Sequence, residues 1–247
     1  MSLNKEGVYR NVLFSGAATL IAELATLPIC TIKTNYQNTS SNSILETIGV
    51  IYKRHGIRTF FAASLPAIGA QMLSTASKFT IYEYLKENRF LELKDHAMLS
   101  SMKNGAISGV ISSLMTHPLD VIRVAWQMDV KITPQLRQLG PMLFYRGYSK
   151  TLSKVLVASS LFFPIYDRCK KEINSPILAS CISAVISTSM MQPIDYMKTR
   201  HLSGLNPWNG FKVFNYYKGL SLNLIRIVPH FTITMTMIEL LKSLFEE

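Results

Sequence analysis

At three places in this chain a proline is followed at a fixed distance by a cation, and at two of them also by an acid. Residues 193–200 read PIDYMKTR, residues 118–123 read PLDVIR and residues 28–33 read PICTIK, so the last of these has cysteine in place of the acid. On a helix, side chains three residues apart lie on one face, where each charge can pair within its own helix or with a neighbouring one. The chemistry that this spacing indicates is the making and breaking of ion pairs.

Two further landmarks follow each copy in the same register. An aromatic-rich triplet is followed, 20 residues after its last position, by an acid. Self-similarity at a fixed period is typical of tandem repeats. The sequence therefore predicts one domain, residues 1–247, built from repeats at approximately 1–95, 96–174 and 175–247. The triplets end at Ala63, Gly147 and Gly219, and the acids are Glu83, Asp167 and Glu239.

These motifs resemble those of the mitochondrial carrier family, in which P-x-[DE]-x-x-[KR]-x-[RK], [DE]-G-x-x-x-x-aromatic-[KR]-G and [FY]-[DE]-x-x-[RK] are repeated three times. The resemblance covers nearly the whole chain, and the trimmed second and third repeats are also similar to short, mimivirus-like carriers encoded by giant DNA viruses. It implies an all-α membrane protein with six transmembrane helices, in three tandem pseudo-threefold repeats around a central cavity. It also implies a transporter of the mitochondrial inner membrane, that of a host if the source is viral.

Six apolar segments agree with that architecture. The apolar fraction is 48%, yet no run of about 18 uncharged apolar residues occurs, as expected if polar side chains line a transmembrane cavity. A soluble helical solenoid is the alternative, because tandem helix pairs also give repeats. Segments such as 14–30 and 99–119 are too long and apolar for surface helices, which favours a membrane. The six segments are 11–37, 66–88, 98–127, 149–171, 176–203 and 219–244.

Loop charges predict the orientation in the membrane. The loops after the first, third and fifth segments contain eight Lys and Arg residues against two acids, and by the positive-inside rule such loops belong in the matrix. An even number of spans then places both termini toward the intermembrane space. Residues 1–10 show neither a secretory signal nor an Arg-rich presequence.

Nothing in the sequence indicates catalysis, a metal or nucleic acid. Cys30, Cys169 and Cys181 lack metal-ligand spacing, and their odd number favours reduced thiols. No nucleophile, base and orienting group can be placed together, and the cations are dispersed through the repeats rather than clustered with aromatics on one face. We expect no enzyme activity, no cofactor, no metal and no nucleic-acid partner.

The resemblance implies that the motif charges form a matrix gate, in which each acid pairs with a cation of another repeat. Cys30 offers no carboxylate, so we expect this gate to be one pair short. Each motif proline removes a backbone donor and bends its helix, which brings the charges toward the centre. The expected set is Asp120 with Lys198, Asp195 with Lys33, position 30 with Arg123, Gln37 and Gln127 as hydrogen-bonding braces, and Pro28, Pro118 and Pro193 as helix kinks.

A second gate is expected on the cytoplasmic side, where the acids of the third landmark pair with lysines. If the two gates cannot close together, breaking one must be offset by forming the other, which gives alternating access. The alternative is that these are interfacial charges that reach toward lipid headgroups, but every acid keeps one offset from a cation in repeat register. The cytoplasmic gate comprises Glu83, Lys86, Asp167, Lys170, Glu239 and Lys242.

Substrate-binding residues are expected seven residues beyond the triplets, at positions that match the family's contact points. Cations one helical turn from two of these positions predict two basic patches that face each other across the cavity. Such patches suit an anion with separated charges, and a nucleoside polyphosphate fits better than a small dicarboxylate. The expected residues are Ala70, Lys154 with Val155, and Arg226, with Lys150, Lys78 and His230 as neighbouring cations.

Other positions leave the solute and the activity open. Ala70 stands where adenine nucleotide carriers have arginine, which argues against a plain ADP/ATP exchanger. Glu23 could receive an amine or a base-edge donor, couple a proton, or form an ion pair with Lys78 or another cation. We expect exchange of nucleotides or deoxynucleotides by a functional monomer in contact with membrane lipid, including cardiolipin. The alternatives are another anion, such as phosphate or a carboxylate, and a non-transporting carrier-like scaffold, which the changes at Cys30 and Ala62-Ala63 would fit.

Overall fold

The computed structural model describes residues 5–39, 43–87, 97–172, 176–230 and 233, and these residues are mostly helical, without a strand among them. The prediction of an all-α fold is confirmed. A further helical stretch over 220–230 follows the last named element. In chain order the elements are α1 (Lys5–Asn38), α2 (Ile44–His55), η1 (Gly56–Phe61), α3 (Ser64–Glu87), α4 (Ala97–Gln127), α5 (Ile132–Leu139), η2 (Gly140–Tyr145), α6 (Tyr148–Glu172), α7 (Pro176–Leu202) and η3 (Val213–Tyr217), where η denotes a 3-10 helix.

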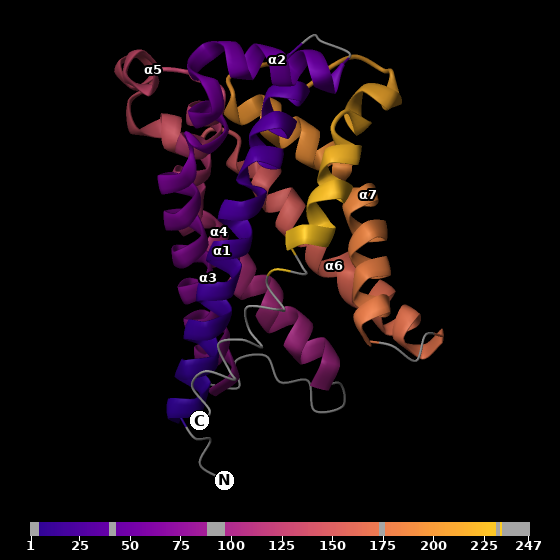
Figure 1. The fold of residues 1–247 in the computed structure, drawn as a ribbon. Coiled ribbons are helices and arrows are strands. Elements are labelled where there is room, and N and C mark those ends of the chain that lie inside the picture. The colour runs from indigo at the N-terminus through magenta and orange to yellow at the C-terminus, as the bar shows by residue number, and fades with distance from the viewer. Residues whose placement is uncertain (1–4, 40–42, 88–96, 173–175, 231–232, 234–247) are drawn as a thin grey trace.

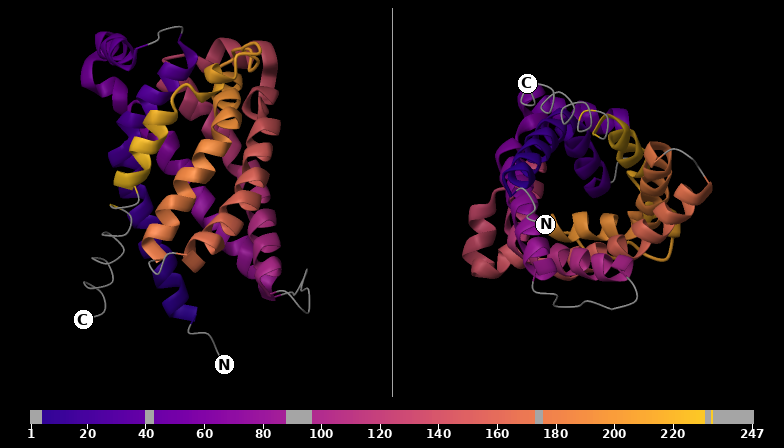
Figure 2. Two further views of the ribbon diagram at one scale, coloured as in Figure 1. Left: turned by 90° about the vertical axis from the view of Figure 1, so that its right-hand side faces the viewer. Right: turned by 90° about the horizontal axis from the view of Figure 1, so that it is seen from below.

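The long helices form a ring when the bundle is viewed along its axis (Figure 2). Helix α3 packs against both α1 and α4, and α6 packs against both α4 and α7. Helices α1, α4 and α7 also contact one another directly. Each of these three contains a motif proline within its length, at Pro28, Pro118 and Pro193, and each continues as helix on both sides of it. The ring thus brings the three proline motifs to one level.

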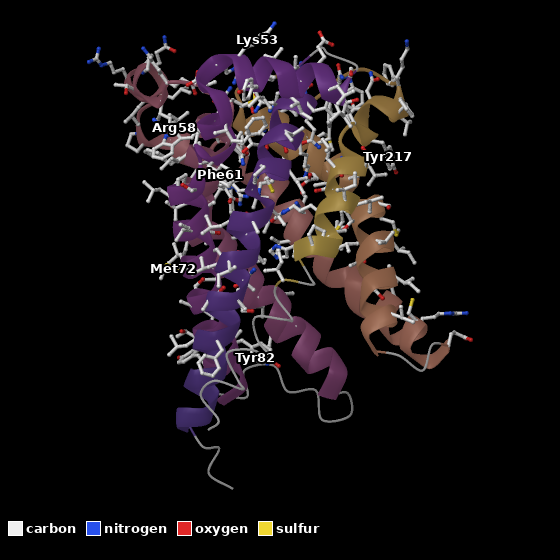
Figure 3. All side chains as sticks on the ribbon, viewed as in Figure 1. Lys53, Arg58, Phe61, Met72, Tyr82 and Tyr217 are labelled. Atoms are coloured by element: carbon white, nitrogen blue, oxygen red, sulfur yellow. The ribbon has the colours of Figure 1, made fainter. Side chains whose placement is uncertain are left out.

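Short elements cover one end of the ring. Helices α2 and α5 lie at this end (Figure 1), and the side chains of Lys53 and Arg58 also lie there (Figure 3). Helix α2 begins at Ser43, whose side chain accepts a hydrogen bond from the Glu46 backbone N–H, as an N-cap serine does. Together with η1, η2 and η3, these helices connect each proline helix to the helical segment that follows it.

The predicted apolar segments match helices of the structure, with the sixth described only as far as residue 230. By length and apolar composition, one described segment qualifies as a membrane span, Gly16–Asn38, with a mean hydropathy of 1.3. Other helices carry many polar residues inward; α4, for example, buries Ser112, Thr116 and His117. Polar residues of this kind lower the mean hydropathy of a helix, and the six spans and three repeats stay predictions.

Candidate functional site

Two ion pairs join the three proline helices at the level of their motifs. Nζ of Lys198 on α7 donates to Oδ2 of Asp120 on α4 at 2.8 Å. Lys33 on α1 pairs with Asp195 on α7, which is only 5% exposed. Both pairs are those that the family resemblance implied, and both connect different helices rather than neighbours on one helix.

The third connection differs from the expected one. Cys30 is buried and supplies no carboxylate, but Arg123 on α4 does not lack an acid, because it pairs with Glu23 on α1. Glu23 lies seven residues before Cys30, which places it two helical turns away on nearly the same face. The expectation that one pair would be missing is therefore wrong, and the pairs connect α1, α4 and α7 in a closed ring.

Glu23 also binds a residue expected to contact the substrate. Its second carboxylate oxygen accepts from Nη2 of Arg226, in the stretch 220–230. Nε of Arg226 donates to Oγ1 of Thr26 at 3.3 Å. Glu23 is 3% exposed, and a carboxylate so buried requires cationic partners. Of the roles open from the sequence, the structure shows an ion pair, with two arginines rather than with Lys78.

Asp195 has a second partner besides Lys33. Nζ of Lys154 on α6 pairs with Oδ1 of Asp195, so one carboxylate connects α1, α6 and α7. The side chain of Lys154 is 35% exposed, against 7% for Asp195. Lys154 is thus part of the ion-pair cluster and open to solvent at once. We call the pairs of Glu23, Asp120 and Asp195 with their cations the ion-pair ring.

The two glutamines expected to brace the ion pairs have other partners. Gln37 donates to the Lys218 carbonyl at 3.1 Å, and Gln127 accepts from the Thr34 hydroxyl at 2.7 Å. Among the described residues, neither glutamine forms a hydrogen bond with an acid or cation of the ring. The expected bracing role of Gln37 and Gln127 is therefore wrong, because both side chains pack against backbone and hydroxyl groups beside the pairs.

Asn223 occupies the bracing position instead. Its Oδ1 accepts from Nζ of Lys33 at 2.8 Å, and its Nδ2 donates to Oε1 of Gln192 at 2.8 Å. Gln192 in turn donates to the Lys218 carbonyl at 3.0 Å. The position of Gln192 directly before the motif proline Pro193 could have drawn attention to it, whereas nothing in the repeat register singles out Asn223.

The turn between η3 and residue 220 explains why the last triplet ends in glycine. Gly219 has φ +85°, and an added Cβ would lie 3.1 Å from Cγ of Gln37, so both backbone conformation and space favour glycine. Beside it, Nζ of Lys218 donates to the Thr39 carbonyl at 2.6 Å and lies 4.6 Å from the Tyr36 ring centroid. Burial and the nearby charge of Arg200 lower the pKa of Lys218. Through these contacts the turn packs the end of α1 against the start of the last helical stretch.

Two of the cavities beside the ion-pair ring share Lys154 and Met191. The larger, of about 440 Å³, lies among α3, α4, α6 and α7 and includes Ala70, Lys78 and Val155. The smaller, of about 230 Å³, lies between α6, α7 and residues 223–230. Its lining includes Arg226, His230 and Asn223 together with Lys154 and Asp195.

The expected binding residues are therefore largely gathered around these cavities. Lys150 and Glu23 are different, since they line neither of them. Lys78 lines the larger cavity, is exposed, and has no ion pair with a described residue. The expected cytoplasmic gate lies outside the described residues for Glu239 and Lys242, and outside the described side chains for Glu83, Lys86, Asp167 and Lys170.

The charges around the cavities do not balance within the described residues. Three acids of the ring face five cations, and Lys78 adds a sixth. Unpaired positive charge inside a helix bundle is costly unless water or an anion meets it. The arrangement suits the binding of an anionic solute of small size.

A helical ring closed by ion pairs beside a cationic cavity is the kind of site that a solute carrier requires. The family model described as "Mitochondrial carrier protein" matches residues 4–91 and 94–176, two successive segments of similar length. The chain therefore belongs to the mitochondrial carrier family, whose members are transporters.

Several curated proteins are similar over most of the chain. A mitochondrial carrier-like protein of Acanthamoeba polyphaga mimivirus is 47% identical over 95% of this chain and 97% of its own length. A chloroplastic thylakoid ADP,ATP carrier protein of Arabidopsis thaliana is 25% identical over 81% of this chain and 54% of its own length. A mitochondrial thiamine pyrophosphate carrier of Kluyveromyces lactis is 24% identical over 78% and 68%. The similarity to a short viral carrier is thus much closer than that to carriers named for a substrate.

Proposed function

We propose that this protein exchanges anionic solutes, foremost nucleotides or deoxynucleotides, across the mitochondrial inner membrane by alternating access. The observation that carries the proposal is the surplus of cations around the two adjoining cavities. Lys154 lines both cavities, Arg226 lines the smaller and Lys78 the larger. A solute with several negative charges would meet all three, as a nucleoside di- or triphosphate does. Relatives named as carriers of ADP, ATP and thiamine pyrophosphate agree with a phosphorylated solute.

We further propose six transmembrane helices in three repeats, with both termini toward the intermembrane space. Apolar side chains exposed on the long helices support a lipid environment, because large exposed apolar areas are unusual on proteins surrounded by water. Met72 is one of these, and it points away from the bundle (Figure 3). None of them lines the two cavities. They include Leu65, Met72, Leu114, Met115, Leu156, Leu178, Val185, Met190, Ile225 and Val228.

The ion-pair ring supports a closed matrix gate in this conformation. Opening toward the matrix would separate α1, α4 and α7 and break the pairs of Asp120, Asp195 and Glu23. Separating buried charges is costly, and substrate contacts together with closure of a cytoplasmic gate would offset that cost. The cytoplasmic gate proposed above remains part of this mechanism. One chain contains the whole ring, so a monomer suffices.

Ala70 and Val155 suit the less polar part of the solute. Both line the larger cavity together with Gly105 and Gly109, which have no side chain. We place the base there and the phosphates between Lys154 and Arg226, with His230 as a neighbouring donor. Lipid contacts, including cardiolipin, would lie outside this site.

The test is uptake by liposomes that contain the purified protein. Liposomes preloaded with single compounds would be offered labelled nucleotides, deoxynucleotides, phosphate, dicarboxylates and amino acids. We expect uptake of nucleotides or deoxynucleotides only when a nucleotide is present inside, and its loss in Arg226→Ala and Lys154→Ala. Arg137→Ala, at an exposed cation of α5, is the matched control and should transport normally.

Other results would change the assignment in defined ways. Uptake of phosphate or a carboxylate alone would keep the carrier and replace its substrate. Absence of all uptake by protein that unfolds cooperatively on heating would favour the non-transporting scaffold, and with it the reading of Cys30 and Ala62-Ala63 as lost function.

A further inference from the structure

Glu23 holds a position that neither the repeat pattern nor the contact points assign. It lies between two arginines from different helices, Arg123 on α4 and Arg226 in the last helical stretch. Through these contacts a single carboxylate connects three segments of the ring. In the described part of the chain, it provides the ion pair between α1 and α4.

The sequence change at Cys30 explains why this acid is needed. A motif acid at position 30 would serve Arg123 directly, and Cys30 and Arg123 do line one narrow cavity of about 140 Å³. With cysteine there, Arg123 instead reaches the acid two helical turns away. Glu23 thus substitutes for the missing motif acid from outside the repeat register.

The same carboxylate engages the cation that an anionic solute would use. Arg226 lines the smaller cavity, and two of its donors, Nε and Nη2, already bind Thr26 and Glu23. An oxyanion that binds this edge of the guanidinium must take the place of Glu23. A negative solute beside Glu23 would also repel its carboxylate and weaken the contact with Arg123.

We propose that Glu23 is the third acid of the matrix gate and that an anionic solute competes with it for Arg226, so that solute binding loosens the connection between α1 and α4. The proposal rests on transport by alternating access. Its consequence is that the empty carrier keeps its gate closed, while the loaded carrier opens it.

Thermal unfolding of the purified full-length chain without any solute tests the gate. Glu23→Gln keeps the size of the side chain and removes its charge, and we expect a melting temperature several degrees below that of the wild type. Cys30→Asp added to Glu23→Gln should recover at least half of the loss, because it returns an acid to the motif position. Glu172→Gln, at an exposed acid near the end of α6, is the matched control and should melt as the wild type does. Equal melting of Glu23→Gln and wild type, or no recovery in the double variant, would overturn the gate role.

Thiol labelling gives a second measurement that does not depend on the melting temperature. Cys30 is 7% exposed and lies beside the ring. In a background with Cys169→Ser and Cys181→Ser, where it is the remaining cysteine, it should react slowly with a bulky maleimide. Glu23→Gln should accelerate this reaction by on the order of tenfold or more, as expected when a buried charge pair loses one partner. Unchanged labelling would contradict a gate at this position.

The competition is tested with ATP as the probe. ATP should accelerate Cys30 labelling in the wild-type background and should add little in Glu23→Gln, whose gate is already loosened. It should also bind Glu23→Gln several-fold more tightly, since no carboxylate competes for Arg226. ATP that leaves wild-type labelling unchanged, or that binds Glu23→Gln more weakly, would overturn the competition. Labelling and melting that follow these expectations while no solute is transported would refute the proposed function and leave the gate role intact.

Discussion

At the scale of single residues, two ion pairs of the ring join residues in repeat register, and a third depends on the length of an arginine side chain. Asp120 pairs with Lys198, and Asp195 pairs with Lys33, as the family resemblance implied. Glu23 could not be identified in this way, because it lies two helical turns before position 30 and outside the repeated motif. A long arginine side chain makes the difference, since it can reach an acid that lies away from the expected position.

Returning the missing acid should stabilise the gate modestly. Cys30→Asp should raise the free energy of unfolding by about 1–2 kcal/mol, the range of a charge-assisted hydrogen bond, since Arg123 would gain a second carboxylate. The gain stays modest because Glu23 already serves Arg123. Thermal unfolding with Cys30→Ser as the uncharged control measures this effect, and a loss of stability in Cys30→Asp alone would show that position 30 cannot accommodate the charge.

Removing one partner of an ion pair in repeat register should change the free energy of unfolding by more than Cys30→Asp does. Asp120→Asn should lower stability by roughly 3 kcal/mol, the lower end for a buried pair that loses one partner, because the Asp120 side chain is 25% exposed. Lys198→Met combined with Asp120→Asn should be less harmful than the single change, as no unpaired cation remains. Denaturant or thermal unfolding of the two variants compares them, and additive losses would exclude a direct pair.

At the scale of elements, apolar segments predict where long helices lie but not what their ends contact. The six predicted segments agree with helices of the structure as far as these are described. The expected bracing by Gln37 and Gln127 failed because each side chain faces a turn or a neighbouring hydroxyl, a relation that depends on how helices cross. Helices α2 and α5 were not foreseen either, although Ser43 before Ile44 is a typical helix start.

The turn at Gly219 offers a test of this packing. Gly219→Ala should cost about 2 kcal/mol, because it adds a contact with Gln37 to the strain of a positive φ, which alone costs roughly 1–2 kcal/mol. Gly210 has φ +76° with nothing within 4 Å of an added Cβ, so Gly210→Ala isolates the strain. Melting temperatures of the two variants should differ accordingly, and equal losses would assign no role to the contact with Gln37.

At the scale of the whole molecule, the sequence predicts the all-α fold and the charged residues that line the two cavities, because both depend on features that recur in register. The sequence does not predict that one carboxylate pairs with two cations. Asp195 serves Lys33 and Lys154, and Glu23 serves two arginines, which follows from how five helical segments converge. In the proposed mechanism, this sharing means that the cations that bind the substrate and the cations of the gate pair with the same carboxylates.

The difference between Lys154 and Lys78 tests that sharing. Lys154→Ala should reduce both nucleotide uptake and stability, because Asp195 loses a partner. Lys78→Ala should reduce uptake with little change in stability, since Lys78 is exposed and has no ion pair with a described residue. Uptake by liposomes and melting temperatures measure the two effects separately. Equal melting of both variants would mean that Lys154 contributes nothing to the ring.

The surplus of cations also has an electrical consequence. In the described residues, six cations and three acids around the cavities give the empty site a charge of about +3. A solute of charge −3 would make the loaded site neutral, whereas a solute of charge −4 would leave it negative. An exchange of two solutes whose charges differ by one would move one net charge across the bilayer, worth about 2.3 kcal/mol per 100 mV. The membrane potential, and not only the concentrations on the two sides, would decide the direction of such an exchange.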